Sequence, residues 1–238
     1  MNTSIRRFTL LIALLFGFAA TSQAVIVYNA TPSSAGTLTT ESGVASYLQQ
    51  VTLNGPNTTY TITAMTIGIN FNAIGNGQQD AFLDFYTGLN LSPSATDALA
   101  GATLVASEGV GFNDPGAAGS YAFTVTFTTP FTVPSNTFGI VFSLLDNTSF
   151  AYSTEISPLF RLGGVPTVGS NPGFAWNDAN QDGVFPGSEQ TKFGNATSAN
   201  YYMSITATAA VPEPGSLALM VVGGLGLLLG VQRHRRSK

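Results

Sequence analysis

Oxygen-bearing side chains recur at every second position at the start of the segment 178–189, whose sequence is DANQDGVFPGSE. Counted from Asp178, the first, third and fifth residues are acids or an amide, the sixth is glycine and the twelfth is glutamate. Calcium is held by about six to eight hard oxygen ligands, and its loops supply them at these positions, with a backbone carbonyl from the seventh. The spacing therefore predicts a Ca²⁺ loop whose ligands are Asp178, Asn180, Asp182, Val184 and Glu189.

A second interpretation of the segment 178–189 is a surface turn rich in Asn, Asp and Gly that binds nothing. No helix-forming sequence flanks it, because Pro172 and Gly173 precede it and the residues after Lys192 are polar. The segment is therefore similar to the calcium loops of helix–loop–helix and dockerin-type modules in its ligands alone. Pro186 also loosens the match. The sequence leaves both interpretations open.

Asp80, Phe82 and Asp84 form a second candidate group, because their spacing places all three on one face of a strand. Two carboxylates beside an aromatic ring suit glycoside hydrolysis or stacking on a sugar, and the alternative is a solvated acidic face. Trp176 and the tyrosines are candidates for a sugar platform, although large aromatic side chains more commonly belong to a core.

The chain contains no cysteine, and its single histidine is His234, near the C-terminus. Thiol nucleophiles, Ser–His–Asp triads and multi-histidine metal sites in a folded domain are therefore excluded. A Gly-rich phosphate loop and a Gly-x-Ser-x-Gly elbow are also missing from the sequence. We expect a protein that is not an enzyme, with a secreted glycosidase using Asp80 and Asp84 as the distant alternative.

Short runs rich in Thr, Val, Ile, Phe and Tyr occupy residues 25–210, separated by Gly, Pro and Asn. Apolar and polar residues alternate within them, for example over 65–71, and a period of two places the apolar side chains on one sheet face. We expect an all-β domain over 25–210, a single antiparallel β-sandwich with a jelly-roll-like topology. The predicted strands are 25–28, 44–53, 59–71, 80–87, 102–112, 120–133, 137–145, 151–162 and 199–208, with a helical turn near 96–102.

Charge is distributed unevenly along the chain. Residues 25–211 hold eleven acidic and two basic side chains, a net charge of −9, whereas the whole chain has a net charge of −4. An acidic body repels phosphate backbones, so nucleic acid is not expected as a partner. The remaining basic residues lie close to the two ends of the chain, outside the predicted domain.

The first 24 residues have the three parts of a secretory signal peptide. Arg6 and Arg7 precede an apolar run over 8–20, and the small residues Ser22 and Ala24 follow it. We expect a signal helix within 1–24 and cleavage by signal peptidase between Ala24 and Val25.

The other end of the chain is predicted to enter the membrane. The segment 216–232 has no charged side chain, and we expect it to form a transmembrane helix whose glycines are tolerated in lipid. The basic tail 233–238 follows, and its positive side chains keep this end in the cytoplasm. The residues that stop transfer are Arg233, Arg235, Arg236 and Lys238.

Two prolines enclose a glutamate just before this segment, in Val211-Pro212-Glu213-Pro214, and they force an extended, accessible chain. The motif, the glycine-bearing apolar segment and the terminal arginines together resemble the PEP-CTERM sorting region, over residues 211–238. The resemblance implies a bacterial envelope protein whose Pro212, Glu213 and Pro214 are recognised by an exosortase-type enzyme. It implies an inner-membrane anchored intermediate, followed by the cell surface or the extracellular space, in organisms that make exopolysaccharide.

We therefore expect a secreted cell-surface or extracellular-matrix protein with a non-enzymatic structural or adhesive role. The first alternative is a carbohydrate-binding module that recognises exopolysaccharide. The expected partners are signal peptidase, the exosortase-type enzyme and, through the C-terminal helix, the membrane.

Overall fold

The structure is a computed structural model, and the residues that it describes are 23–31, 37–40, 46–55, 59–72, 79–113, 115–146, 153, 155–162, 165–178, 180–191 and 199–209. All of them except Gln23 belong to one unit, which spans Ala24–Ala209. Apart from its last two residues, the predicted signal peptide 1–24 lies outside the described residues, as does the whole of 211–238 with its predicted membrane helix 216–232. In the described part of the chain, no helix is both long enough and apolar enough to cross a membrane.

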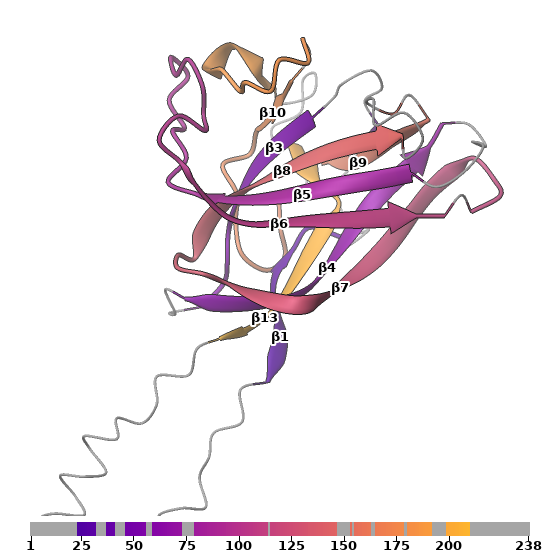
Figure 1. The fold of residues 1–238 in the computed structure, drawn as a ribbon, viewed down its shortest axis with the longest axis horizontal. Coiled ribbons are helices and arrows are strands. Elements are labelled where there is room, and N and C mark those ends of the chain that lie inside the picture. Colours follow the sequence, from indigo (N-terminus) through magenta and orange to yellow (C-terminus); the bar gives the residue numbers. More distant parts are fainter. Residues whose placement is uncertain are drawn as a thin grey trace, which may run out of the picture. The chain divides into compact units, whose positions relative to one another are not determined.

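The described residues form antiparallel β-sheets, which confirms the predicted all-β class (Figure 1). The first sheet has the order β1-β13-β4-β9-β12, with β7 paired to β4 and β2 paired to β9. Its strands are β1 (Ala24–Asn29), β2 (Thr37–Thr40), β4 (Tyr60–Phe71), β7 (Gly119–Val133), β9 (Ile156–Leu162), β12 (Ala199–Tyr201) and β13 (Met203–Ala209).

The second sheet has the order β11-β10-β3-β8-β5-β6. Its strands are β3 (Ser46–Thr52), β5 (Gln79–Thr87), β6 (Thr103–Phe112), β8 (Thr137–Asp146), β10 (Ala175–Asn177) and β11 (Gln190–Thr191). The period-two pattern is clear in β5, where Ala81, Leu83 and Phe85 are fully buried. Phe82 and Asp84 alternate with them and are half-buried on the other face. β5 therefore presents one apolar face to the core, as the alternation predicted.

One large core lies between the sheets, which makes the unit a sandwich. Ile67 and Ile205 of the first sheet belong to the same buried cluster as Phe85 and Phe142 of the second. The ring of Phe142 stacks on that of Tyr201 with centroids 5.6 Å apart. Burying a side chain of this size stabilises the fold by about 1.5–3 kcal/mol, so this cluster supplies most of the driving force. The finer jelly-roll topology stays a prediction.

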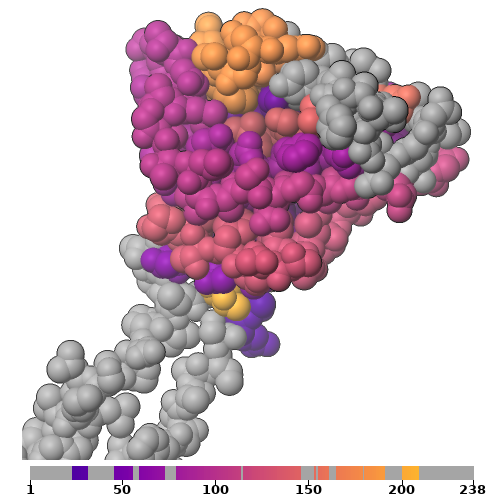
Figure 2. Space-filling model, in the orientation of Figure 1, coloured from indigo at the N-terminus to yellow at the C-terminus, as the bar shows by residue number. Residues whose placement is uncertain are grey.

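Two segments cover part of the outer face of the second sheet. We call residues 88–102 and 178–190 the cap, and Figure 2 shows its purple-to-magenta and orange parts at the same end of the domain. A second buried cluster joins the cap to the sheet through Leu48, Ala98, Val141, Trp176 and Phe185. The two segments are also hydrogen-bonded, because the Ala98 N–H donates to the Phe185 carbonyl at 2.8 Å. The cap is thus a packed part of the fold.

The helical turn predicted near 96–102 is present as turns without an α-helix. The Ala102 N–H donates to the carbonyl of Leu99 at 2.9 Å, three residues earlier. The predicted strand 199–208 is divided at Tyr202, and the predicted strand 151–162 begins only at Ile156.

Candidate functional site

The loop that follows β10 winds around the carboxylate of Asp178. This side chain is fully buried, and its Oδ1 accepts the N–H of Asp182 at 3.0 Å while its Oδ2 accepts the N–H of Gly183 at 3.0 Å. Asn180 Oδ1 accepts the same Asp182 N–H at 3.2 Å. Two of the predicted ligand oxygens therefore meet at one nitrogen, which places them close together inside the turn.

The tight winding requires a left-handed backbone at two positions. Gly183, the sixth residue of the loop, has φ +74°, and no atom lies within 4 Å of the point that a Cβ would occupy, so its conformation alone selects glycine. Gln181 has φ +62°, an uncommon value for a residue with a side chain. The glycine was the position that the spacing marked for the sharp turn, whereas nothing in the sequence indicated Gln181.

Asp182 closes the loop from the other side. Its Oδ1 accepts the N–H of Val184 at 2.8 Å, and its Oδ2 accepts the amide N–H of Asn180 at 3.0 Å. The side chain is exposed, in contrast to the buried carboxylate of Asp178. The loop therefore has one buried carboxylate, from Asp178, and one exposed carboxylate, from Asp182.

Glu189, the twelfth residue, ends the single-turn 3₁₀ helix η1 (Gly187–Glu189). Its Oε2 is buried and has no hydrogen-bond partner. Burial raises the pKa of this carboxyl above its ordinary value, and the nearby charges of Asp178 and Asp182 raise the pKa further. Glu189 therefore interacts electrostatically with the two other acids of the loop.

The positions of the acids also set a limit on metal binding. Among the described residues, no three His, Cys, Asp or Glu side chains are close enough to form a metal-binding group as they stand. The oxygens that the loop offers are of several kinds, namely carboxylates, the Asn180 amide and the Val184 carbonyl, which suit a hard cation such as calcium better than a transition metal.

Asp97 is a residue of this region that the sequence did not single out. Its Oδ1 accepts the N–H of Leu99 at 2.9 Å and that of Phe185 at 3.2 Å. One carboxylate therefore holds both segments of the cap. The position of Asp97 in a turn predicts its hydrogen bond with Leu99. No sequence pattern predicts its bond with Phe185, which lies 88 residues away in the sequence.

Asp80, Phe82 and Asp84 lie on the outer face of β5, as predicted. Phe82 pairs with Gly109 of β6 and Ser143 of β8, and all three side chains of the group are half-buried. Trp176 is fully buried and packs edge-on against Phe174, with ring centroids 5.1 Å apart. Of the two interpretations of Trp176, the sugar platform is therefore excluded, and its assignment to a core is confirmed.

One of the two predicted processing sites lies within the described residues, and the other lies outside them. The predicted cut between Ala24 and Val25 falls within the first residues of β1, where Val25 is 49% exposed. Pro212, Glu213, Pro214 and the basic residues Arg233, Arg235, Arg236 and Lys238 lie outside the described residues.

Comparison with known families identifies the C-terminal region. The family model of the PEP-CTERM protein-sorting motif matches residues 210–236. No curated protein matches the chain. The motif indicates an exported, sorted protein, and the described residues form an all-β domain. Its motif implies membrane-anchored sorting and processing by an exosortase-type enzyme.

Proposed function

We propose that the β-sandwich is a non-enzymatic structural or adhesive domain of a cell-surface or extracellular-matrix protein, and that Ca²⁺ in the loop 178–189 holds its cap. The observation that carries the proposal is the fully buried Asp178 carboxylate, which accepts two backbone N–H groups of a left-handed turn, together with the buried Glu189 Oε2, which has no hydrogen-bond partner. The ion would be held by Asp178, Asn180, Asp182, the carbonyl of Val184 and Glu189. Calcium supplies charge neutralisation there, and no reaction step is involved.

A cation relieves a conflict that is visible in the loop. Asp178 and Asp182 oppose ionisation of Glu189, so a bound divalent cation would stabilise all three negative charges together. The same loop contacts the other half of the cap through Phe185. Calcium would therefore stabilise a part of the outer surface, which is a structural role. Extracellular modules of this kind bind Ca²⁺ with a dissociation constant of about 10⁻⁴–10⁻³ M.

Calorimetry and thermal unfolding of the protein purified from the cell surface test this proposal. We expect saturable Ca²⁺ uptake and, at about 10 mM Ca²⁺, an added stability of roughly 1.4–2.7 kcal/mol from the linkage relation. Asp182→Asn should abolish both effects, because it removes a ligand charge from an exposed position.

Asp80→Asn is the matched control, since it makes the same charge change on β5, away from the loop. It should bind Ca²⁺ as the wild type does. Equal uptake by Asp182→Asn and the wild type, or no uptake by either, would contradict the proposal.

A further inference from the structure

Acidic and aromatic side chains alternate along the outer face of β5. Asp80, Phe82, Asp84 and Tyr86 follow one another at every second position, and all four are half-buried. We call these four residues the β5 strip. At about 3.4 Å per residue, the strip is roughly 20 Å long, which is enough for several sugar units.

Small neighbours leave the ring of Phe82 accessible. Gly109 lies opposite Phe82 on β6, and a Cβ at that position would be only 3.4 Å from the Phe82 ring. Ser107 and Gly111 follow on the same face of β6 and are exposed. The ring therefore leans over a strand whose side chains do not cover it.

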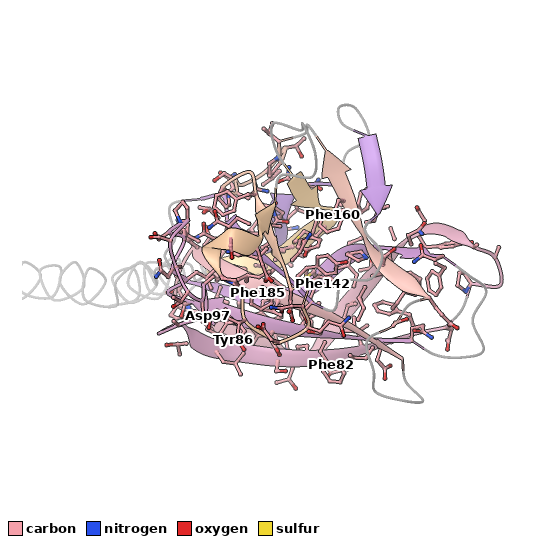
Figure 3. The ribbon with its side chains drawn as sticks, turned by 90° about the horizontal axis from the view of Figure 1, so that it is seen from above. Phe82, Tyr86, Asp97, Phe142, Phe160 and Phe185 are labelled. Carbon is pink, nitrogen blue, oxygen red and sulfur yellow. The ribbon has the colours of Figure 1, made fainter. Side chains whose placement is uncertain are left out.

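The cap bounds one end of the β5 strip. Tyr86 packs against the cap cluster, and its pKa is raised by burial and by the nearby charges of Asp84 and Asp97. Figure 3 shows Tyr86 and Asp97 close together at this end, with Phe82 farther along the sheet. Leu104, opposite Tyr86 on β6, is 51% exposed. The cap thus borders the β5 strip at Tyr86, and the rest of the strip continues along the sheet away from the cap.

The two carboxylates of the strip are available to a ligand. Neither the Asp80 nor the Asp84 carboxylate takes part in a hydrogen bond within the described part of the chain. A carboxylate accepts hydrogen bonds from hydroxyl groups, and the face of an aromatic ring packs against sugar C–H groups. The alternation of these two groups suits a chain of hydroxyl-bearing rings.

We propose that the β5 strip binds an uncharged glycan, with Phe82 stacking on a sugar ring and Asp80 and Asp84 accepting its hydroxyl hydrogens. Charge excludes an anionic polysaccharide, because residues 25–211 have a net charge of −9 and would repel it. The inference deepens the adhesive role proposed above by naming its ligand class. The glycan site depends on the cap for one of its boundaries. It does not require a calcium ion that contacts the sugar.

Affinity electrophoresis of the protein from the cell surface tests the site, with a neutral β-glucan and a neutral galactomannan as probes. We expect Phe82→Ala to weaken binding roughly threefold to tenfold, the range that aromatic contacts supply, while Phe82→Tyr retains it. Asp84→Asn should also weaken binding. Thr126→Ala, at an exposed position on β7 of the other sheet, is the control and should bind as the wild type does. Thermal unfolding checks that each variant is folded.

The inference is overturned by no retention by either neutral glycan, by equal retention of Phe82→Ala and the wild type, or by retention by polylysine in place of the glycans. Release of sugars from a retained glycan would also overturn it, because the strip would then be a catalytic site. Repeating the measurement on Asp182→Asn separates the two proposals. Glycan binding by this variant that persists without Ca²⁺ uptake supports the strip independently of the loop. Ca²⁺ uptake by the wild type without glycan binding supports the loop alone.

Discussion

Asp178 is the residue on which the local structure of the loop depends most. A buried carboxylate that accepts two backbone N–H groups stabilises the turn, and its removal leaves both donors without an acceptor. We expect Asp178→Ala to lower the free energy of unfolding by roughly 2–4 kcal/mol without calcium. Urea denaturation in a chelator measures the loss.

Asp84→Ala is the comparison for this prediction, because the Asp84 side chain is half-buried on a sheet face and makes no hydrogen bond within the described residues. Its effect should stay within about 0.5 kcal/mol. Similar losses in the two variants would show that the turn does not depend on Asp178.

The raised pKa of Glu189 predicts that calcium binding depends on pH. Its pKa is raised, first by burial and then by Asp178 and Asp182, so the calcium-free fold favours the protonated form. Its contribution to stability is therefore present at low pH and is lost as the pH rises through the raised pKa. Calcium has the opposite preference, because it binds the ionised carboxylate. We expect Ca²⁺ affinity to fall as the pH is lowered from neutral through the raised pKa of Glu189.

Glu189→Gln separates this carboxyl from the other acids of the loop. The amide does not ionise, so the variant should bind Ca²⁺ more weakly and lose the part of the pH dependence that begins above the ordinary glutamate range. Calorimetric titrations at several pH values make the comparison. The same pH profile in the variant and the wild type would assign the dependence to another group.

At the scale of elements, the cap depends on the close approach of its two segments. A Cβ at Gly187 would lie 2.0 Å from the Pro93 carbonyl oxygen, so Gly187→Ala must push the segments apart. Gly101, also in the cap, has φ +80° and open space around it, so Gly101→Ala adds backbone strain alone. We expect Gly187→Ala to cost about 1–3 kcal/mol and to loosen the cap.

Trp176 reports the difference between these two variants. It is the single tryptophan of the chain and is fully buried in the cluster beneath the cap. Its fluorescence should shift to the red in Gly187→Ala, because water reaches the ring, and stay unchanged in Gly101→Ala. A red shift in both variants would mean that strain alone opens the cap.

The elements that sequence reasoning predicted best are those with a clear period of two. The strands over 59–71 and 120–133 were expected within a residue or two of β4 and β7, because apolar side chains alternate along them. The short strands β2, β10 and β11 were missed, since two to four residues carry too little pattern. The break at Tyr202 was missed for another reason. Its N–H donates to Leu159 and its carbonyl accepts from Gly68, and such contacts depend on tertiary pairing.

The same distinction holds for the candidate site. The ligand spacing of the loop and the shared face of Asp80 and Asp84 follow from local geometry, so both were predictable. The burial of Trp176 and the bond from Phe185 to Asp97 depend on how the cap folds onto the second sheet. That packing joins segments that are far apart in the sequence, so the pattern within any one segment does not predict it.

At the scale of the whole molecule, folding and sorting are separate properties of the chain. The compact unit spans Ala24–Ala209, and the sorting motif spans residues 210–236. A change of Glu213 therefore leaves the residues that build the core untouched. We expect Glu213→Ala to fold normally but to retain its C-terminal tail, because it removes the acid from the Pro-Glu-Pro recognition sequence.

Intact-mass spectrometry of membrane and surface fractions tests sorting directly. The wild-type surface species should begin near Val25 and end near Pro212–Pro214, whereas Glu213→Ala should accumulate in the membrane with the tail attached. Glu108→Ala is the matched control, since it removes an acid within β6 of the domain and should be processed as the wild type is. Normal processing of Glu213→Ala would show that the enzyme reads the prolines or the apolar segment instead. A wild-type chain found only with its tail, in the membrane, would show that the C-terminal segment is a permanent anchor.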